Sequence, residues 1–443
     1  MSHLRFDPLA SSAPLIVYID YKSTYAYLAK DPTYALVDEF GIEVDWRPFT
    51  LDIPSYLGSA RLNDQGRVVD NQRSGGQWTR VKYAYHDARR YGAPRGLVVR
   101  GTSKTWDSSL AGIGMLWAKA QSERVLHAYS DRVYNRFWKR ELDIEDLAAI
   151  EGILTDSGAN SAGFQAYAAG AGRALHDDIQ RAAFDAGIFG VPTYVVGGER
   201  LFGREHLPRV RWLLTGRHGP PPDVAYEDVA ARHATVDALM HSALSVVIDF
   251  KNPYSYLALG PTCALTNELG IVTDWLPFLV SPWRKRSPSP GDDRGACHRR
   301  YRAEYAESEV LRYAAARGLT LRGLYRESDA TLPGIGLLWT KRSRASMTQA
   351  YVQRVCEQYW REELDLEDHG AIRQLLEQIG VPVRGFDTFV NHDGLAEIER
   401  VQSELREAGI FDVPAYRLGS DVYMGRQHLP VLRSLLARRR GQP

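Results

Sequence analysis

The chain has 443 residues, of which 44% are hydrophobic and 25% charged, and its formal net charge is +1. This length suits two or three domains with cores of their own, and the composition is that of an ordinary globular protein. The small net charge gives no reason to expect nucleic acid or a membrane surface as a partner, and the first apolar run, Leu15–Ile19, is too short for a signal peptide or a membrane span.

The three cysteines, Cys263, Cys297 and Cys356, all lie in the second half of the sequence. They form no C-x-x-C pair and no metal-ligand spacing, so we expect no metal site. Unpaired cysteines favour a reducing compartment, and we therefore expect a cytoplasmic protein.

One segment occurs twice. LIVYIDYKSTYAYL covers residues 15–28, and SVVIDFKNPYSYL covers residues 245–257. Each copy has an apolar run typical of a strand, then an Asp, a Lys, a short turn and the aromatic start of a helix. Asp20 and Asp249 lie at equivalent positions, 229 residues apart. The sequence thus predicts an internal repeat.

Within the first half, residues 15–20 predict a strand, residues 25–40 a helix and residues 42–49 a second strand. Such a β-α-β unit has parallel strands. Residues 50–77 lack a clear period and predict a long loop over a site. From about residue 79 to 186 the pattern is helical, which predicts an inserted helical subdomain.

The closing segment of each half also repeats. AGIFGVPTYVVGGERLFGREHLP starts at Ala186 and AGIFDVPAYRLGSDVYMGRQHLP at Ala408, which are 222 residues apart, so the first half has seven more residues in its long loop. Residues 193–202 predict a hairpin around two glycines. A helix from Glu205 should follow.

We therefore predict an α/β protein with two tandem thioredoxin-like domains. The first covers residues 1–216, with its helical insertion at about 79–186. A Pro-rich linker covers residues 217–242. The second domain covers residues 243–443, with its insertion at about 301–408.

The two repeated segments resemble the DsbA-like branch of the thioredoxin superfamily. The most similar members are the glutathione-dependent 2-hydroxychromene-2-carboxylate isomerases and the kappa-class glutathione transferases, which open with D-F-x-S-P-Y and close with G-V-P-T. Two departures stand out, since Thr24 replaces the family's proline in the first half and Asn252 replaces its serine in the second. Gln427 stands where the first half has Glu205, so the second half lacks both a hydroxyl and a carboxylate.

The resemblance implies that Ser23 stabilises a glutathione thiolate at the mouth of the first helix, with Asn252 as its weaker counterpart. A helix N-terminus favours an anion there, although a serine at this position also suits a plain N-cap. The resemblance further places glutathione, the implied cofactor, against five residues: Tyr25, Val191, Pro192, Gly203 and Glu205. It implies cis peptide bonds at Val191-Pro192 and Val413-Pro414.

Two further groups are candidates for the substrate cleft. Arg80, Tyr83, Asp87 and Arg90 have the spacing of one helix face and match a pattern of the family's helical domain, but they equally suit a surface ion-pair ladder. Ser108, within Asp107-Ser108-Ser109, lines the cleft or, as we rather expect, caps the next helix.

The function implied is a glutathione-dependent isomerase or transferase acting on a small aromatic or electrophilic substrate. One alternative is a thiol-disulfide oxidoreductase of the DsbA family, which the absence of C-x-x-C opposes. Another is a non-catalytic module that binds a ligand or partner, because fold alone does not settle function. Related single-domain proteins are generally dimeric, so we expect the two halves to pack as an intramolecular pseudo-dimer.

Overall fold

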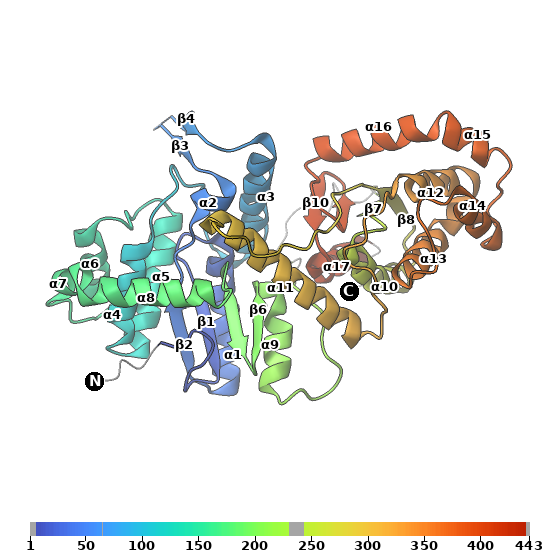
Figure 1. Cartoon of the computed structure of the whole chain (residues 1–443). Coiled ribbons are helices and arrows are strands. Elements are labelled where there is room, and N and C mark those ends of the chain that lie inside the picture. The colour runs from blue at the N-terminus through green and yellow to red at the C-terminus, as the bar shows by residue number, and fades with distance from the viewer. Residues whose placement is uncertain (1–5, 64, 230–242, 440–443) are drawn as a thin grey trace. The chain divides into compact units, whose positions relative to one another are not determined.

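The computed structural model describes residues 6–63, 65–229 and 243–439, and it divides the chain into two compact units (Figure 1). The first unit comprises Met1–Val224 together with Pro288–Arg302, and the second comprises Ala225–Ser287 and Ala303–Pro443. Residues 217–229 form no helix or strand, and the rest of the predicted linker, residues 230–242, lies outside the described residues.

The first unit is built on a four-stranded sheet in the order β2-β1-β5-β6. β1 (Leu15–Ile19) pairs in parallel with β2 (Val44–Pro48) and antiparallel with β5 (Thr193–Val196), which forms a hairpin with β6 (Glu199–Phe202). All five residues of β1 are buried, as its unbroken apolar run requires of a central strand.

The second unit repeats this sheet. β7 (Leu244–Ile248) pairs in parallel with β8 (Thr273–Pro277) and antiparallel with β9 (Ala415–Leu418), which in turn pairs with β10 (Asp421–Met424). The order β10-β9-β7-β8 is that of the first sheet read from its other edge. The predicted fold class, two tandem thioredoxin-like domains, is confirmed.

The helix after each first strand starts at a polar cap. α1 (Thr24–Phe40) is capped by Ser23 and ends at Gly41, whose φ of 59° is the left-handed conformation that glycine adopts without strain. α10 (Pro253–Glu268) is capped by Asn252, whose side chain accepts from two backbone N–H groups.

A set of helices is inserted between the second and third strands of each sheet. In the first unit these helices are α3 (Gly75–Gly92), α4 (Ser109–Lys119), α5 (Glu123–Trp138), α6 (Leu147–Asp156), α7 (Phe164–Ala169) and α8 (Ala171–Asp185). Their counterparts are α11 (Arg294–Ala316), α12 (Thr331–Arg344), α13 (Thr348–Trp360), α14 (His369–Gln378), α15 (Phe386–Asn391) and α16 (Gly394–Glu407). The last helices are α9 (Leu207–Leu214) and α17 (Leu429–Arg439), so α9 begins two residues after the predicted start.

A repeated glycine explains how the inserted helices pack. A Cβ on Gly114 would lie 2.2 Å from the hydroxyl of Tyr129, and one on Gly336 would lie 2.1 Å from that of Tyr351. Each tyrosine is buried and donates a hydrogen bond into the preceding helix, to the carbonyl of Ala111 or Pro333. Only a residue without a side chain allows α4 and α5, or α12 and α13, to approach so closely.

Residues 50–77 are more ordered than the predicted loop. They contain α2 (Ile53–Leu57) and a hairpin of β3 (Ala60–Leu62) and β4 (Val68–Asn71). The hairpin is joined to a later segment near its turn, because the N–H of Leu62, the last residue of β3, donates to the carbonyl of Ser103 over 2.7 Å. The prediction of a long loop was therefore wrong in expecting no regular elements, since local turn hydrogen bonds replace a periodic apolar pattern here.

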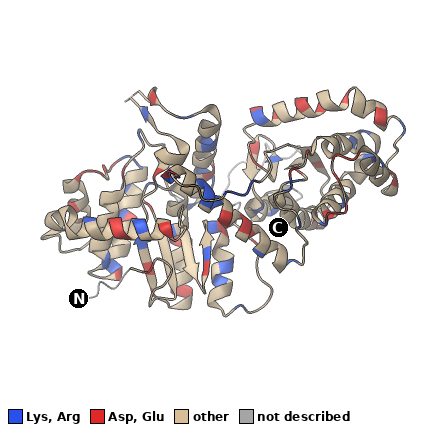
Figure 2. Ribbon diagram, viewed as in Figure 1, with Lys and Arg blue, Asp and Glu red and all other residues tan. Residues whose placement is uncertain are grey.

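Charged residues of both signs are interspersed along the helices of each unit (Figure 2). Among the described residues, no helix is both long and apolar enough to cross a membrane.

Candidate active site

A buried carboxylate fixes the turn that leads into α1. Asp20 follows β1 and is 3% exposed. It accepts hydrogen bonds from the N–H of Lys22 (3.1 Å), the N–H of Leu51 (2.8 Å) and the hydroxyl of Ser108 (2.5 Å). One side chain thereby joins the end of β1, the segment after β2 and the start of α4, and the backbone carbonyl of the same residue accepts from the N–H of Ser23 at 3.0 Å.

The second unit keeps the carboxylate and its two backbone partners, since the N–H groups of Lys251 and Val280 replace those of Lys22 and Leu51. Asp249 accepts from the N–H of Val280 at 2.8 Å and from the ammonium of Lys251 at 2.6 Å. Burial raises the pKa of Asp249, and the Lys251 charge opposes that rise. Ala330 occupies the position equivalent to Ser108, so the hydroxyl donor is missing.

Ser23 lies at the N-terminus of α1 and is 7% exposed. Its Oγ accepts from the N–H of Ala26 at 3.2 Å, which is an N-cap bond. The same hydroxyl donates to the carbonyl of Val191 over 3.4 Å, near the outer limit for a hydrogen bond. The hydroxyl proton is therefore only weakly held and is directed toward the Val-Pro loop.

The peptide bonds Val191-Pro192 and Val413-Pro414 are both cis, which confirms that prediction. The carbonyl of Pro192 accepts from the N–H of Gly203 at 2.9 Å. The carboxylate of Glu205 lies over Gly203, so close that a Cβ on this glycine would be 2.3 Å from it.

A buried ion pair lies on α3. The guanidinium of Arg90 is 3.1 Å from the carboxylate of Asp87, and both side chains are almost fully buried. Burial, and next the nearby Asp87 charge, raise the pKa of Tyr25 well above its ordinary value, with Glu205 acting in the same direction. The spacing of these α3 residues therefore produces a buried ion pair that faces Tyr25, rather than a surface ladder.

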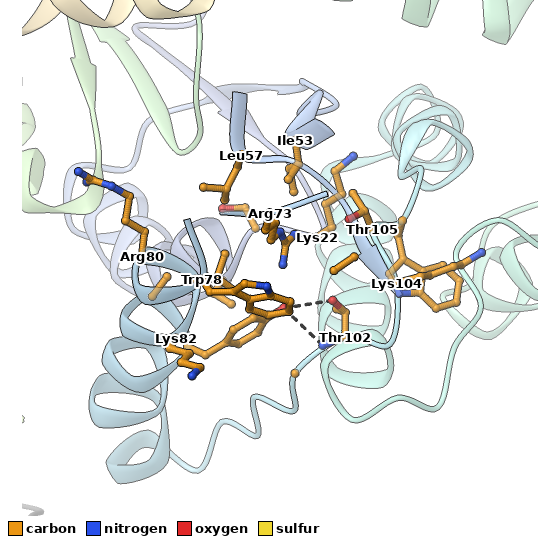
Figure 3. A pocket seen from close by; sticks show the side chains of 18 of the residues that line it. Lys22, Ile53, Leu57, Arg73, Trp78, Arg80, Lys82, Thr102, Lys104 and Thr105 are labelled. Carbon is orange, nitrogen blue, oxygen red and sulfur yellow. Dashed lines mark hydrogen bonds between the residues drawn. The ribbon is translucent and has the colours of Figure 1, made fainter. Parts of the chain in front are cut away.

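A cavity of about 560 Å³ opens at the mouth of α1. Its walls are the start of α1, α2, the β3–β4 hairpin, α3, residues 101–106 and Trp138 at the end of α5. Figure 3 shows Trp78, Arg80 and Lys82 rising from α3 on one side, and Ile53 and Leu57 of α2 on another.

The cavity lining is cationic and aromatic. The cations are Lys22, Arg73, Arg80, Lys82, Arg89 and Lys104, and the rings are those of Tyr25, Tyr56, Trp78, Tyr85, Trp106 and Trp138. None of the described residues that line the cavity is an Asp or a Glu. Some cations rest on rings, since Arg73 lies 5.1 Å from the Trp78 ring and Lys104 lies 4.2 Å from that of Trp106. Such a lining suits a flat ligand that carries negative charge.

The structure brings some of the predicted site residues together and separates others. Ser23, Tyr25 and Arg80 line the cavity, and Val191 contacts Ser23. The remaining four cleft candidates are not among the lining residues: Tyr83, Asp87, Arg90 and Ser108.

The expected capping role of Ser108 is wrong. It occupies the N-cap position of α4 but makes no side-chain cap bond, because its hydroxyl is used by Asp20 instead. A nearby carboxylate competes successfully with a neutral backbone N–H group, since charge-assisted hydrogen bonds are the stronger kind.

Several lining residues were missed at the level of sequence. Lys22 stands in both repeats, as Lys22 and Lys251, and this repetition was an available signal. Leu51, Ile53 and Leu57 come from residues 50–77, which we predicted to lie over a site, but the segment has no clear period that would single out these three residues.

None of the three cysteines is among the residues that line this cavity. Cys263 and Cys356 are buried, and burial raises the pKa of the Cys263 thiol to about 11 and that of Cys356 further. Within the described part of the chain, no cluster of three or more His, Cys, Asp or Glu side chains could hold a metal ion.

The sheet order, the cis proline and the helix mouth beside it define a thioredoxin-like protein, here with a serine at the helix mouth. The sequence profile described as "DSBA-like thioredoxin domain" matches residues 14–214 and again residues 243–437. The chain therefore belongs to the DSBA-like thioredoxin family, with two copies of the domain.

Individual relatives match about one half of the chain each. A curated 2-hydroxychromene-2-carboxylate isomerase from Pseudomonas putida is 24% identical over 194 residues, which cover 43% of this chain and 88% of that protein. A solved 2-hydroxychromene-2-carboxylate isomerase matches with 20% identity and a TM-score of 0.36, covering 44% of this chain and 95% of its own. The cytosolic disulfide reductase DsbM from Pseudomonas aeruginosa matches with 16% identity and a TM-score of 0.33, and the match covers 45% of this chain and 97% of DsbM.

Proposed function

We propose that the protein is a glutathione-dependent isomerase or transferase that acts on a small aromatic electrophile bearing negative charge. The observation that carries the proposal is the position of Ser23, whose hydroxyl lies at the mouth of α1, 3.4 Å from the Val191 carbonyl, and lines the cavity. The 24% identical relative is named an isomerase, which supports the reaction class.

The residues at the helix mouth fit a thiol ligand. The weak bond from Ser23 to Val191 leaves the hydroxyl proton able to turn toward a sulfur anion at little cost. The N-terminal end of α1 adds the favourable potential of its unpaired N–H groups. Glu205, folded over Gly203, offers a carboxylate for an ammonium group. When bound, glutathione would supply a thiol that ionises to a nucleophile.

The energetic requirement on Ser23 is modest. Lowering a thiol pKa from about 8.5 by about two units requires about 2.7 kcal/mol of preference for the charged form. A hydrogen bond to a charged group contributes about 1.5–3 kcal/mol, so one hydroxyl and a helix end suffice.

The cavity lining indicates the substrate class. Rings of Trp78, Trp106 and Tyr85 provide flat contact surfaces, and Lys82 and Arg80 are exposed cations at the same cavity. An aromatic carboxylate would meet stacking surfaces and counter-charges without a repelling acid.

Dithiol exchange is the weaker candidate. Three cysteines without a C-x-x-C provide no reactive pair, and Cys263 and Cys356 have raised pKa values that suppress the thiolate. All three cysteines are free, which supports a cytoplasmic setting as part of this proposal. The pairing of the two halves as a pseudo-dimer stays a prediction.

Calorimetric titration tests the proposal with two peptides: glutathione, and ophthalmate, which has a methyl group in place of the thiol. We expect glutathione to bind the wild-type protein with proton release near neutral pH, and ophthalmate to bind without it. Ser23→Ala should raise the pKa of the bound thiol by about one to two units and so remove most of the proton release. Absence of glutathione binding at cellular concentrations would refute the function, and binding without turnover of any aromatic electrophile would favour a binding module.

A further inference from the structure

Part of the second half belongs to the first compact unit. Residues Pro288–Arg302 follow the second sheet's parallel strands in the sequence, yet they pack with Met1–Val224. They include the beginning of α11, which starts at Arg294 and lies beside α2 in Figure 1. A segment from the second domain copy is therefore built into the unit that holds the cavity.

The contact with α2 is close enough to require a glycine. A Cβ on Gly295 would lie 2.3 Å from the backbone carbonyl oxygen of Ser55 in α2, a distance that no side chain tolerates. Arg294, one residue earlier, lies 3.3 Å from the carboxylate of Asp52 and 4.1 Å from the ring of Phe184. These contacts hold the start of α11 on both α2 and α8.

His298 makes the contact that matters for the cavity. Its ring stacks on Tyr56 of α2 with 3.9 Å between ring centres and an angle of 3° between planes. It also meets Phe189 edge-on, with centres 5.7 Å apart. His298 is only 8% exposed, and Tyr56 is one of the residues that line the cavity.

α2 is short and only partly buried. It is five residues long, and none of its residues is fully buried. A helix of one turn is unstable by itself, because nucleation costs more than so few hydrogen bonds return. The orientation of the Tyr56 ring therefore depends on what packs against it, and His298 supplies a parallel aromatic face.

We propose that His298, from the second half of the chain, is a positioning residue that fixes Tyr56 and thereby completes the wall of the first half's cavity. The second domain copy then contributes this segment to the site of the first copy. The inference rests on the proposed function only in taking the cavity as the substrate site. The ligand whose binding depends on His298 is a flat aromatic anion, since Tyr56 offers a ring and the lining is cationic.

The test uses the full chain and the fluorescent probe 1-anilinonaphthalene-8-sulfonate, an aromatic anion with a flat naphthalene ring, with glutathione affinity measured separately. His298→Ala should weaken probe binding about fivefold, and His298→Phe, which keeps a flat ring, should restore it to within about twofold. Gly295→Val should act like His298→Ala, because it forces α11 away from Ser55. Glutathione affinity should be unchanged in all three variants, because none of them alters Ser23 or Val191.

Two controls separate positioning from a general effect. His369→Ala removes another ring pair, that with Phe386 in the second unit (5.6 Å, 19°), and should leave probe binding as in wild type. Gly260→Ala adds a methyl group where nothing lies within 4 Å, and should also be neutral. If His298→Ala fails to fold, His298→Leu replaces it, since leucine fills space without stacking. The inference is overturned if folded His298→Ala or His298→Leu protein binds the probe as tightly as wild type does. This outcome is independent of the proposed function, which fails if the protein does not bind glutathione.

Discussion

The hydroxyl of Ser108 donates a 2.5 Å hydrogen bond to the carboxylate of Asp20. Ser108 opens α4 of the helical insertion, and Asp20 closes β1 of the sheet, so this bond connects the two parts of the first unit. In the second unit the pair becomes Ala330 and Asp249, and the ammonium of Lys251 lies 2.6 Å from the carboxylate. In the first unit the equivalent ammonium, that of Lys22, is 3.7 Å from the carboxylate. The two copies therefore differ in the hydroxyl donor and in how closely the lysine approaches the buried acid.

Ser108→Ala should lower the free energy of unfolding by about 1.5–3 kcal/mol, the range for a hydrogen bond to a charged group. The protein should still fold, because the second unit has alanine at this position. Chemical denaturation measures the loss. The matched control is Ser157→Ala, which removes a buried hydroxyl that donates to the neutral carbonyl of Ile153 at 2.7 Å, and it should cost only about 1 kcal/mol. Equal losses would contradict the charged nature of the first bond.

Gly114→Ala should destabilise the protein by about 1–3 kcal/mol, because its methyl group would overlap the hydroxyl of Tyr129. Gly152→Ala is the control, since this helical glycine in α6 has nothing within 4 Å of its Cβ position. There the better helix propensity of alanine should stabilise by up to about 1 kcal/mol. In thermal unfolding, the midpoint should fall for Gly114→Ala and rise for Gly152→Ala. A rise for Gly114→Ala would refute the packing explanation.

The fold was predictable because its signals are local and repeated. The apolar run of β1, the Asp-Lys turn and the cap of α1 recur in the second half, and each copy supports the assignment of the other. The strand boundaries moved by no more than two residues, as β2 shows (Val44–Pro48 against residues 42–49).

The candidate site was harder to predict because its walls are non-local. Trp78 and Leu57 reach one cavity from segments that share no period, and the bond of Ser108 to Asp20 spans 88 residues. His298 is a stronger case, since it comes from the other repeat and has Gly76, with no ring, at the position 222 residues earlier. Only the folded chain shows such contacts.

His298 should make stability depend on pH. Burial, followed by the charge of Arg302, lowers its pKa to about 4, whereas an unfolded histidine titrates near 6.5. Between these values the unfolded chain holds a proton that the folded chain does not, so stability should fall as the pH drops from about 6.5 to about 4. The charged and titratable groups around the ring are Arg294, Arg299 and Arg302 of its own segment, and Tyr56 and Asp52 of the α2 region.

Denaturation of wild type and His298→Phe at about pH 5 and about pH 7 checks this dependence. The variant should lose less stability on acidification, by at most about 1.4 kcal/mol per pH unit for one proton. His127 and His176 also have lowered pKa values, and the comparison with the variant cancels their contribution. An equal change of stability with pH in wild type and in the variant would rule out His298 as the group responsible.

The two helix mouths should differ in activity. Ser23 presents a hydroxyl whose bond to Val191 is long, at 3.4 Å, whereas Asn252 uses its side-chain oxygen to cap two N–H groups, those of Tyr254 (2.9 Å) and Ser255 (3.2 Å). Ser23→Ala should therefore lower glutathione-dependent turnover of an aromatic electrophile by at least about tenfold, the scale of one lost hydrogen bond to a developing anion. Asn252→Ala should stay near wild type in turnover and lose about 1 kcal/mol of stability as a removed N-cap. A larger loss of turnover in Asn252→Ala than in Ser23→Ala would assign the chemistry to the second half instead.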